Sequence, residues 1–126
     1  MTSDLEVNDG KKAPQEALQD MLAAYTGALN RHDMAAVERI FAEDAVYVSS
    51  GFTAVLRGRA VILSSFRAYF AEHTDQVNED FDLSVTGPHM LHGRWRLKSS
   101  SARRTGHQTV TFNADGLISR IEVVDD

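Results

Sequence analysis

The sequence predicts an α+β domain in which three N-terminal helices pack on one strongly bent antiparallel sheet. Apolar residues recur at helical spacing through much of the first 75 residues, and beyond that point they alternate as they do in strands. No internal repeat or low-complexity segment divides the chain, so helices and strands share one core. We expect the bent sheet and its helices to form a cone-shaped α+β barrel that encloses a pocket.

Length and composition limit the class of protein. Of the 126 residues 43% are hydrophobic and 25% charged, which is typical of a soluble globular domain. The absence of cysteine excludes disulfides and thiolate chemistry, and a net charge of −5 argues against a nucleic-acid partner. With no apolar run of membrane-spanning length and no signal-peptide core, we expect no membrane partner and a cytoplasmic location.

The polar N-terminal residues 1–13 are expected to be a mobile tail, and residues 14–126 a single domain. Pro14 suits the first position of a helix, which an apolar stripe extends to residue 31. Asp33 is a suitable N-cap for a second helix, and Gly58 precedes a third. The helical part of the chain therefore contains three helices.

One strand is expected between the second and third helices, at residues 45–49, where alternation puts Tyr47 and Ser49 on one side. Four more follow, at residues 78–85, 90–99, 106–113 and 117–125. In the first of these, Phe81 shares the inner face with other apolar residues, and Asp80 falls on the outer face.

Two polar clusters are candidate sites in the sequence. A basic hairpin can be an anion or partner surface, or it can be neutralised across strands by Asp80 and Asp82, at about 0.2–1 kcal/mol per pair, and we favour neutralisation. Its members are Arg94, Arg96, Lys98, Arg103 and Arg104. His89 and His92 straddle a turn and have no third ligand at usable spacing, so no metal site is predicted.

Motifs spread over the chain carry a family resemblance. They are Tyr25, Arg31-His32-Asp33, the segments 41–45 (FAEDA), 56–59 (LRGR) and 93–97 (GRWRL), and the closing segment 111–121 (TFNADGLISRI). In this order they resemble the nuclear transport factor 2-like superfamily, in its SnoaL-like and ketosteroid isomerase-like branch. The resemblance implies a pocket for a small, mostly apolar molecule, no cofactor, and a homodimer formed through the sheet.

The resemblance also implies site residues. Ketosteroid isomerases use a tyrosine of the first helix, an aspartate base near the end of the first strand and a neutral acid on a later strand. In this chain these positions fall on Tyr25, Ser49 and Gln108. The base is therefore missing, which argues against isomerisation by the family mechanism. Tyr25 and Gln108 can both donate to one ligand oxygen, or they can bond each other or a buried water and satisfy the core.

Further candidates complete the predicted site. Asp125 is in phase with Ile121 and Val123, so it is either an inward replacement carboxylate or a solvated strand end. The expected substrate-contacting residues are Tyr47, Ser49, Phe52, Phe66, Phe81, Trp95 and Phe112.

Three hypotheses about function follow from these residues. The first is an enzyme of the isomerase, cyclase, dehydratase or hydrolase type that acts on an apolar carbonyl-containing or polycyclic substrate. In this hypothesis Tyr25, Gln108 and Asp125 are the candidate catalytic residues. The second is a binding module that keeps the pocket without the chemistry. The third is a dimeric interaction domain that uses the outer face of its sheet.

Overall fold

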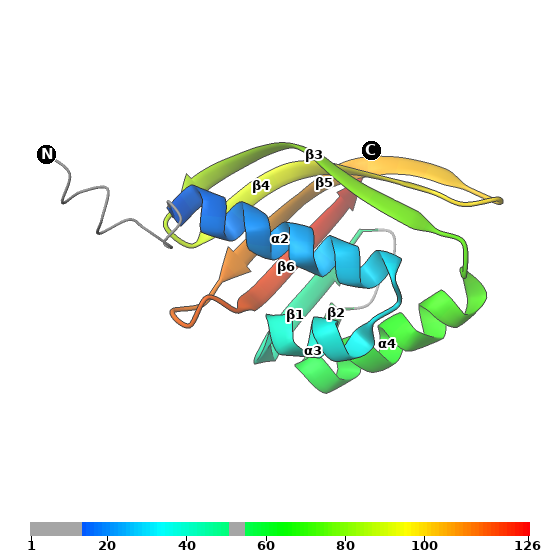
Figure 1. Cartoon of the computed structure of the whole chain (residues 1–126), viewed down its shortest axis with the longest axis horizontal. Helices are drawn as coiled ribbons and strands as arrows, with labels where there is room; N and C mark the ends of the chain where they lie inside the picture. Colours follow the sequence, from blue (N-terminus) through cyan, green and yellow to red (C-terminus); the bar gives the residue numbers. More distant parts are fainter. Residues whose placement is uncertain (1–13, 51–54) are drawn as a thin grey trace, which may run out of the picture.

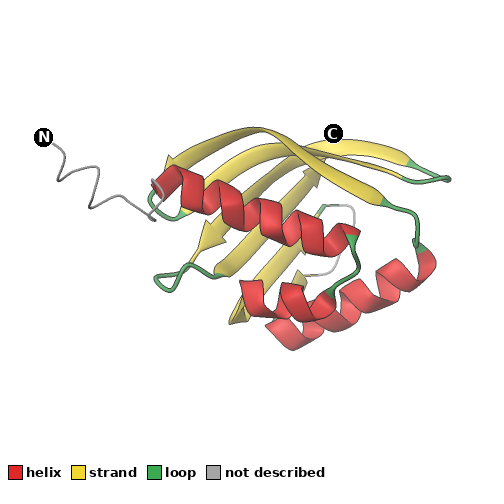
Figure 2. Cartoon of the chain, in the orientation of Figure 1, coloured by secondary structure: helices red, strands yellow, loops and turns green. Residues whose placement is uncertain are grey.

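The computed structural model describes residues 14–50 and 55–126, so the predicted tail lies outside the described residues. Within them, three helices cover one side of a curved, unclosed six-stranded sheet, as Figures 1 and 2 show. The helices are α2 (Pro14–Asn30), α3 (Met34–Ile40) and α4 (Arg59–Glu72). The strands are β1 (Phe41–Ser49), β2 (Val55–Arg57), β3 (Val77–Gly87), β4 (Met90–Lys98), β5 (Arg103–Phe112) and β6 (Ile118–Asp125). The predicted fold class is confirmed.

The predicted helix signals act as expected. The Asp33 carboxylate accepts a hydrogen bond from the Ala36 backbone N–H at 3.1 Å and so caps α3. Phe41 then takes an extended conformation (φ −86°, ψ 142°), so α3 passes directly into β1. Gly58 has a φ of 94°, which turns the chain into α4 at a position where a side chain would be strained.

The strands lie in the order β2-β1-β6-β5-β4-β3. The expectation of an entirely antiparallel sheet is wrong for one pair, because β1 pairs with β6 in parallel. The long stretch of chain between these two strands permits the parallel arrangement. Strand β2 was not predicted, since its three residues are too few to show a period.

The core fills the concave side of the sheet. Helix α2 crosses the inner face of β3 and β4, and α4 packs on β1 and β2 (Figure 1). Fully buried side chains from all three helices and from the central strands meet there, including Leu22, Val37, Ile62, Leu91, Val110 and Ile121. Among the described helices, none has the length and apolar character needed to cross a membrane.

A β-bulge changes which residues of β3 face inward. Asp80 lies opposite Trp95 on β4, but after the register shift between Phe81 and Ser84 the next recorded pair is Ser84 with His92. Asp82, inside the shifted segment, has a φ of 52°. The extra residue reverses the alternation of the strand at this point. The predicted single phase for residues 78–85 is therefore wrong.

The bulge places Phe81 on the outer face of the sheet. The guanidinium carbons of Arg94 and Arg96 lie 5.2 Å and 4.5 Å from the centre of its ring. Arg96 also pairs with Glu79 and Arg94 with Asp126. Neutralisation of the basic hairpin is thus present, but its partners are not the predicted Asp80 and Asp82, because the bulge turns Asp80 inward.

Candidate functional site

A cavity of about 330 Å³ lies between the helices and the concave face of the sheet. Its size is within the range of small-molecule pockets. Apolar and aromatic side chains form most of the wall, and polar groups gather at two places. The lining residues are Tyr25, Thr26, Leu29, Tyr47, Ser49, Leu56, Ser65, Phe66, Tyr69, Phe70, Gln76, Asn78, Asp80, Trp95, Leu97, Arg104, Gln108, Val123 and Asp125.

The first polar group of the cavity centres on a carboxyl group and is called here the Asp80 cluster (Tyr25, Thr26, Asp80 and Gln108). Asp80 Oδ1 accepts a hydrogen bond from Gln108 Nε2 at 2.7 Å, and Oδ2 accepts one from the Thr26 hydroxyl. Burial raises the pKa of Asp80 above its ordinary value, although both hydrogen bonds act to lower it. No salt bridge to Asp80 forms within residues 14–50 and 55–126. The carboxyl therefore holds its proton more tightly than an exposed one.

Tyr25 brings a phenol to the same cluster from α2. Its ring is buried and packs edge-on against Phe41, with the ring centres 5.5 Å apart. Burial raises the pKa of Tyr25 well above its ordinary value, and the charges of Tyr47 and Asp80 raise it further. The hydroxyl makes no hydrogen bond to any residue of the described chain. A neutral phenol is thus available to donate to a bound molecule.

The second polar group is called here the Asp125 cluster (Tyr47, Arg104 and Asp125). The Arg104 guanidinium donates from Nε at 2.9 Å, and also from Nη2, to Oδ2 of Asp125. Burial raises the pKa of Tyr47 to about 12, the charge of Tyr69 adds to the rise, and Arg104 opposes it. Asp125 thus lines the cavity with its carboxylate paired with an arginine, and its role as a replacement carboxylate stays a prediction.

A hydrogen-bonded row of polar side chains runs along one side of the cavity. The Tyr69 hydroxyl donates to Oε1 of Gln76, whose Nε2 donates to Oδ1 of Asn78 at 3.1 Å. Asn30 at the end of α2 then accepts from the Asn78 backbone N–H at 2.8 Å. These bonds fasten α4 and α2 to the start of β3 and hold that side of the cavity in place.

Seven of the ten predicted site residues line the cavity: Tyr25, Tyr47, Ser49, Phe66, Trp95, Gln108 and Asp125. Phe81 does not, because the bulge turns it outward. Phe112 does not either, because it lies beyond a register shift at the end of β5 and is buried in the core. Phe52 falls outside the described residues.

The structure adds a partner to the predicted donor pair. Gln108 Nε2 donates one hydrogen bond to Asp80 Oδ1, and the joint donation of Tyr25 and Gln108 to a ligand stays a prediction. Sequence reasoning missed Asp80, since strict alternation put it outside. The signal that was available is the residue type at position 82, because Asp tolerates positive φ better than most residues and so permits a bulge.

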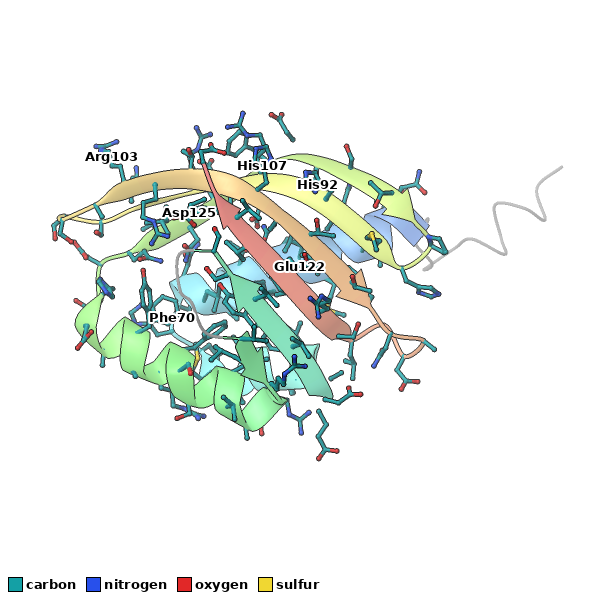
Figure 3. All side chains as sticks on the ribbon, turned by 180° about the vertical axis from the view of Figure 1, so that it is seen from behind. Phe70, His92, Arg103, His107, Glu122 and Asp125 are labelled. Carbon is teal, nitrogen blue, oxygen red and sulfur yellow. The ribbon has the colours of Figure 1, made fainter. Side chains whose placement is uncertain are left out.

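The histidines of the hairpin lie on the other side of the sheet. Figure 3 shows His92 and His107 on the face away from the helices, and Asp125 and Phe70 on the helix side. His92 Nδ1 lies 3.2 Å from the Thr109 hydroxyl, and its ring is stacked on His107. Across the described part of the chain, no group of three or more His, Asp or Glu residues is arranged to hold a metal ion.

The open curved sheet, the covering helices and the cavity between them define the class of cone-shaped α+β domains. A sequence model described as "SnoaL-like domain" matches residues 22–121. The chain therefore belongs to the SnoaL-like domain family, which confirms the resemblance noted in the sequence. No curated protein sequence matches it.

Solved structures share the fold. A polyketide cyclase candidate from Sinorhizobium meliloti is 25% identical, with a TM-score of 0.73 over 82% of this chain and 93% of that one. A ketosteroid isomerase candidate from Kribbella flavida is 21% identical, with a TM-score of 0.74 over 88% and 78%. The epoxide hydrolase/cyclase-like enzyme SalBIII, from formation of the pyran ring of the polyether salinomycin, is 18% identical, with a TM-score of 0.75 over 89% and 92%.

Proposed function

We propose that this protein is a cofactor-independent enzyme that moves a proton on a small, largely apolar, carbonyl-containing or polycyclic molecule. The observation that carries the proposal is the Asp80 carboxyl, which is half-buried in the cavity wall and hydrogen-bonded by Gln108 and Thr26. Groups with raised pKa values that face a cavity are candidates for acid–base chemistry. Asp80 supplies, from β3, the carboxyl that is missing at Ser49.

Each residue of the Asp80 cluster has a role in this proposal. Ionised Asp80 takes a proton from the carbon next to a carbonyl group, or from another weakly acidic position of the substrate. The Tyr25 hydroxyl donates to the oxygen on which negative charge develops. Gln108 and Thr26 bond the carboxyl and keep it oriented. Isomerases, cyclases and dehydratases all use a proton transfer of this kind together with stabilisation of an oxyanion.

The comparisons support this class of reaction without specifying the substrate. SnoaL-like domains bind small molecules in general. Solved structures with the same fold carry names such as polyketide cyclase and epoxide hydrolase/cyclase-like enzyme. Those activities belong to those proteins, and at 25% identity or less they indicate only that the cone fold is compatible with cyclase and isomerase chemistry.

A non-catalytic binding module is the second candidate. It is favoured by the complete pairing of the Asp80 oxygens with Gln108 and Thr26, which satisfies a buried carboxyl without any substrate. In that case Asp80 would maintain the shape of the pocket, and the cavity would hold a ligand unchanged.

Exchange of carbon-bound protons separates the two candidates. The protein is incubated in D₂O with a panel of aryl ketones, and loss of the protons next to the carbonyl is followed by ¹H NMR. We expect the wild-type protein to accelerate exchange and Asp80→Asn to abolish most of the acceleration, since the amide has no basic oxygen to take the proton.

Asp82→Asn is the matched control for this experiment. It makes the same chemical change two residues further along β3, at an exposed position where Asn accepts the positive φ of 52°. Exchange should stay at the wild-type rate in this variant. Binding of a ketone with no exchange in any variant would instead favour the binding module.

We also propose that two copies associate through the outer face of the sheet, as the family resemblance implies. In the described chain the helices lie on the concave side and leave the opposite face uncovered (Figure 1). Val124 on β6 is 51% exposed. Sedimentation velocity over a range of concentrations should show a dimer, and Val124→Glu should shift it toward the monomer. A monomer at every concentration would overturn the assembly without affecting the cavity.

A further inference from the structure

One oxygen in the cavity wall has no hydrogen-bond donor. Both guanidinium contacts of Arg104 go to Oδ2 of Asp125. Oδ1 of the same carboxylate is buried and makes no hydrogen bond within the described chain. A buried carboxylate oxygen without a donor is costly and uncommon in folded proteins. Since Asp125 lines the cavity, a bound molecule can supply the missing donor.

A hydroxyl donor lines the same part of the cavity. Tyr47 on β1 lines the cavity together with Arg104 and Asp125. Its hydroxyl makes no hydrogen bond to any described residue, and its ring is fixed edge-on against Phe66 at 5.2 Å. The cavity wall therefore presents one acceptor and one donor that make no hydrogen bond within the described chain.

We propose that the Asp125 cluster is a subsite for a hydroxyl group of the ligand. A hydroxyl can donate to Oδ1 of Asp125 while it accepts from Tyr47, so it satisfies both groups at once. A ligand carboxylate would be repelled by Asp125, and an ether could only accept. The subsite thus selects an alcohol or phenol.

The position of the subsite defines the substrate class more narrowly. Asp80 lies on β3 and Asp125 on β6, with β4 and β5 between them. The two strand backbones are therefore roughly 14 Å apart across the sheet, because neighbouring strands are spaced by about 4.8 Å. Trp95 of β4 belongs to the part of the wall between these two strands. This inference rests on the proposed function and completes it: the substrate carries a carbonyl group near Asp80, an apolar body, and a hydroxyl at its far end.

Three ketones that differ only at the far end test the subsite. They are 4-(4-hydroxyphenyl)butan-2-one, its 4-methoxy analogue and 4-phenylbutan-2-one, and their Kd values come from NMR chemical-shift titrations. The wild-type protein should bind the phenol at least about fivefold more tightly than the other two, as expected for a hydrogen bond to a charged group. Equal Kd values for the three ketones would overturn the subsite.

Substitutions on β6 and β1 test whether the preference for the phenol arises at the Asp125 cluster. Asp125→Ala should reduce the advantage of the phenol to about onefold, and Tyr47→Phe should reduce it in part. Glu122→Ala is the matched control, because Glu122 is an acidic residue of the same strand whose carboxylate accepts from Arg120 on the exposed outer side (Figure 3). It should keep the full preference. Persistence of the preference in Asp125→Ala would overturn the proposal.

The same titrations distinguish failure of the hydroxyl subsite from failure of the proposed function. Asp80→Asn should weaken the binding of all three ketones by a similar factor and leave the ratios of their Kd values unchanged. A phenol preference that disappears in Asp80→Asn but not in Asp125→Ala would place the hydroxyl at the Asp80 cluster and overturn the subsite. Failure of the wild-type protein to bind any of the three ketones would overturn the proposed substrate class and the subsite with it. Loss of the preference with proton exchange intact would overturn the subsite alone.

Discussion

Gln108 Nε2 on β5 donates a hydrogen bond to Asp80 Oδ1 on β3 over 2.7 Å, across the strand that lies between them. The bond uses one N–H of the amide, so donation of the other to a ligand beside Tyr25 stays a prediction. The bond also gives Gln108 a positioning role, because its amide holds the Asp80 carboxyl in place in the cavity wall.

Removal of the Tyr25 hydroxyl should affect chemistry far more than stability. In Tyr25→Phe we expect ketone proton exchange to fall by about 10²-fold or more, the usual cost of losing one oxyanion donor. The free energy of unfolding should change by less than about 0.5 kcal/mol, since the hydroxyl has no hydrogen-bond partner among the described residues. Exchange NMR and urea denaturation measure the two quantities. Parallel losses in both would indicate that Tyr25 only satisfies the core.

The raised pKa of Asp80 predicts the sign of a pH dependence. Burial, its largest cause, makes the folded state bind this proton more tightly than the unfolded state, whose carboxyl has the ordinary value of 3.8. The contribution of Asp80 to stability is therefore greatest below that value and is lost as the pH rises through the raised pKa. The free energy of unfolding of the wild type, minus that of Asp80→Asn, should fall with increasing pH.

Urea denaturation at several pH values measures this difference, and Asp82→Asn supplies the reference for an exposed carboxyl of the same strand. An increase of the difference with pH would contradict the prediction. Proton exchange should follow the opposite trend, because only the ionised form of Asp80 can accept a proton.

The backbone conformation at Asp82 should control the position of Asp80. Asp82 has a φ of 52°, and a β-branched side chain is strained there by about 1–2 kcal/mol. We expect Asp82→Val to lower both the free energy of unfolding and the exchange rate, whereas Asp82→Gly should retain both. Wild-type exchange in Asp82→Val would show that the bulge does not position the carboxyl.

A side chain added at Gly106 should disturb the cavity wall. A Cβ there would lie 2.1 Å from the Val124 carbonyl oxygen and 2.4 Å from Cζ2 of Trp95. We expect Gly106→Ala to cost about 2–3 kcal/mol of stability, as overpacking does, and to change the fluorescence of Trp95, the only tryptophan of the chain. Gly87→Ala is the control, since nothing lies within 4 Å of its added Cβ. An unchanged emission spectrum in Gly106→Ala would contradict the expected displacement of Trp95.

Local patterns in the sequence predicted much of the fold. The Asp33 cap, the Gly58 turn and the helix or strand character of each long element depend on neighbouring residues, and these predictions are confirmed. Two features could not be predicted in this way. The parallel pairing of β1 with β6 depends on a contact between distant segments, and the three residues of β2 are too few to show a period.

The site shows the same division. Tyr25 and Gln108 were found because helical and strand periods place them inside, and both line the cavity. Asp80 was assigned to the wrong face because one bulge is enough to reverse the alternation of a strand. The sequence pattern places Arg104 among the surface cations of the basic hairpin, whereas in the structure it donates to Asp125 in the cavity wall. Neither orientation can be deduced without the register of the sheet.

The place of β6 between β1 and β5 has a consequence for how the protein matures on the ribosome. The half of the sheet made of β1 and β2 has no hydrogen-bonded link to the other half until β6 is synthesised. During synthesis one edge of β1 therefore stays unpaired until β6, some seventy residues later in the chain, has been translated. Ribosome stalling before Ile118 should leave a nascent chain that recruits chaperones, whereas release after Asp125 should not.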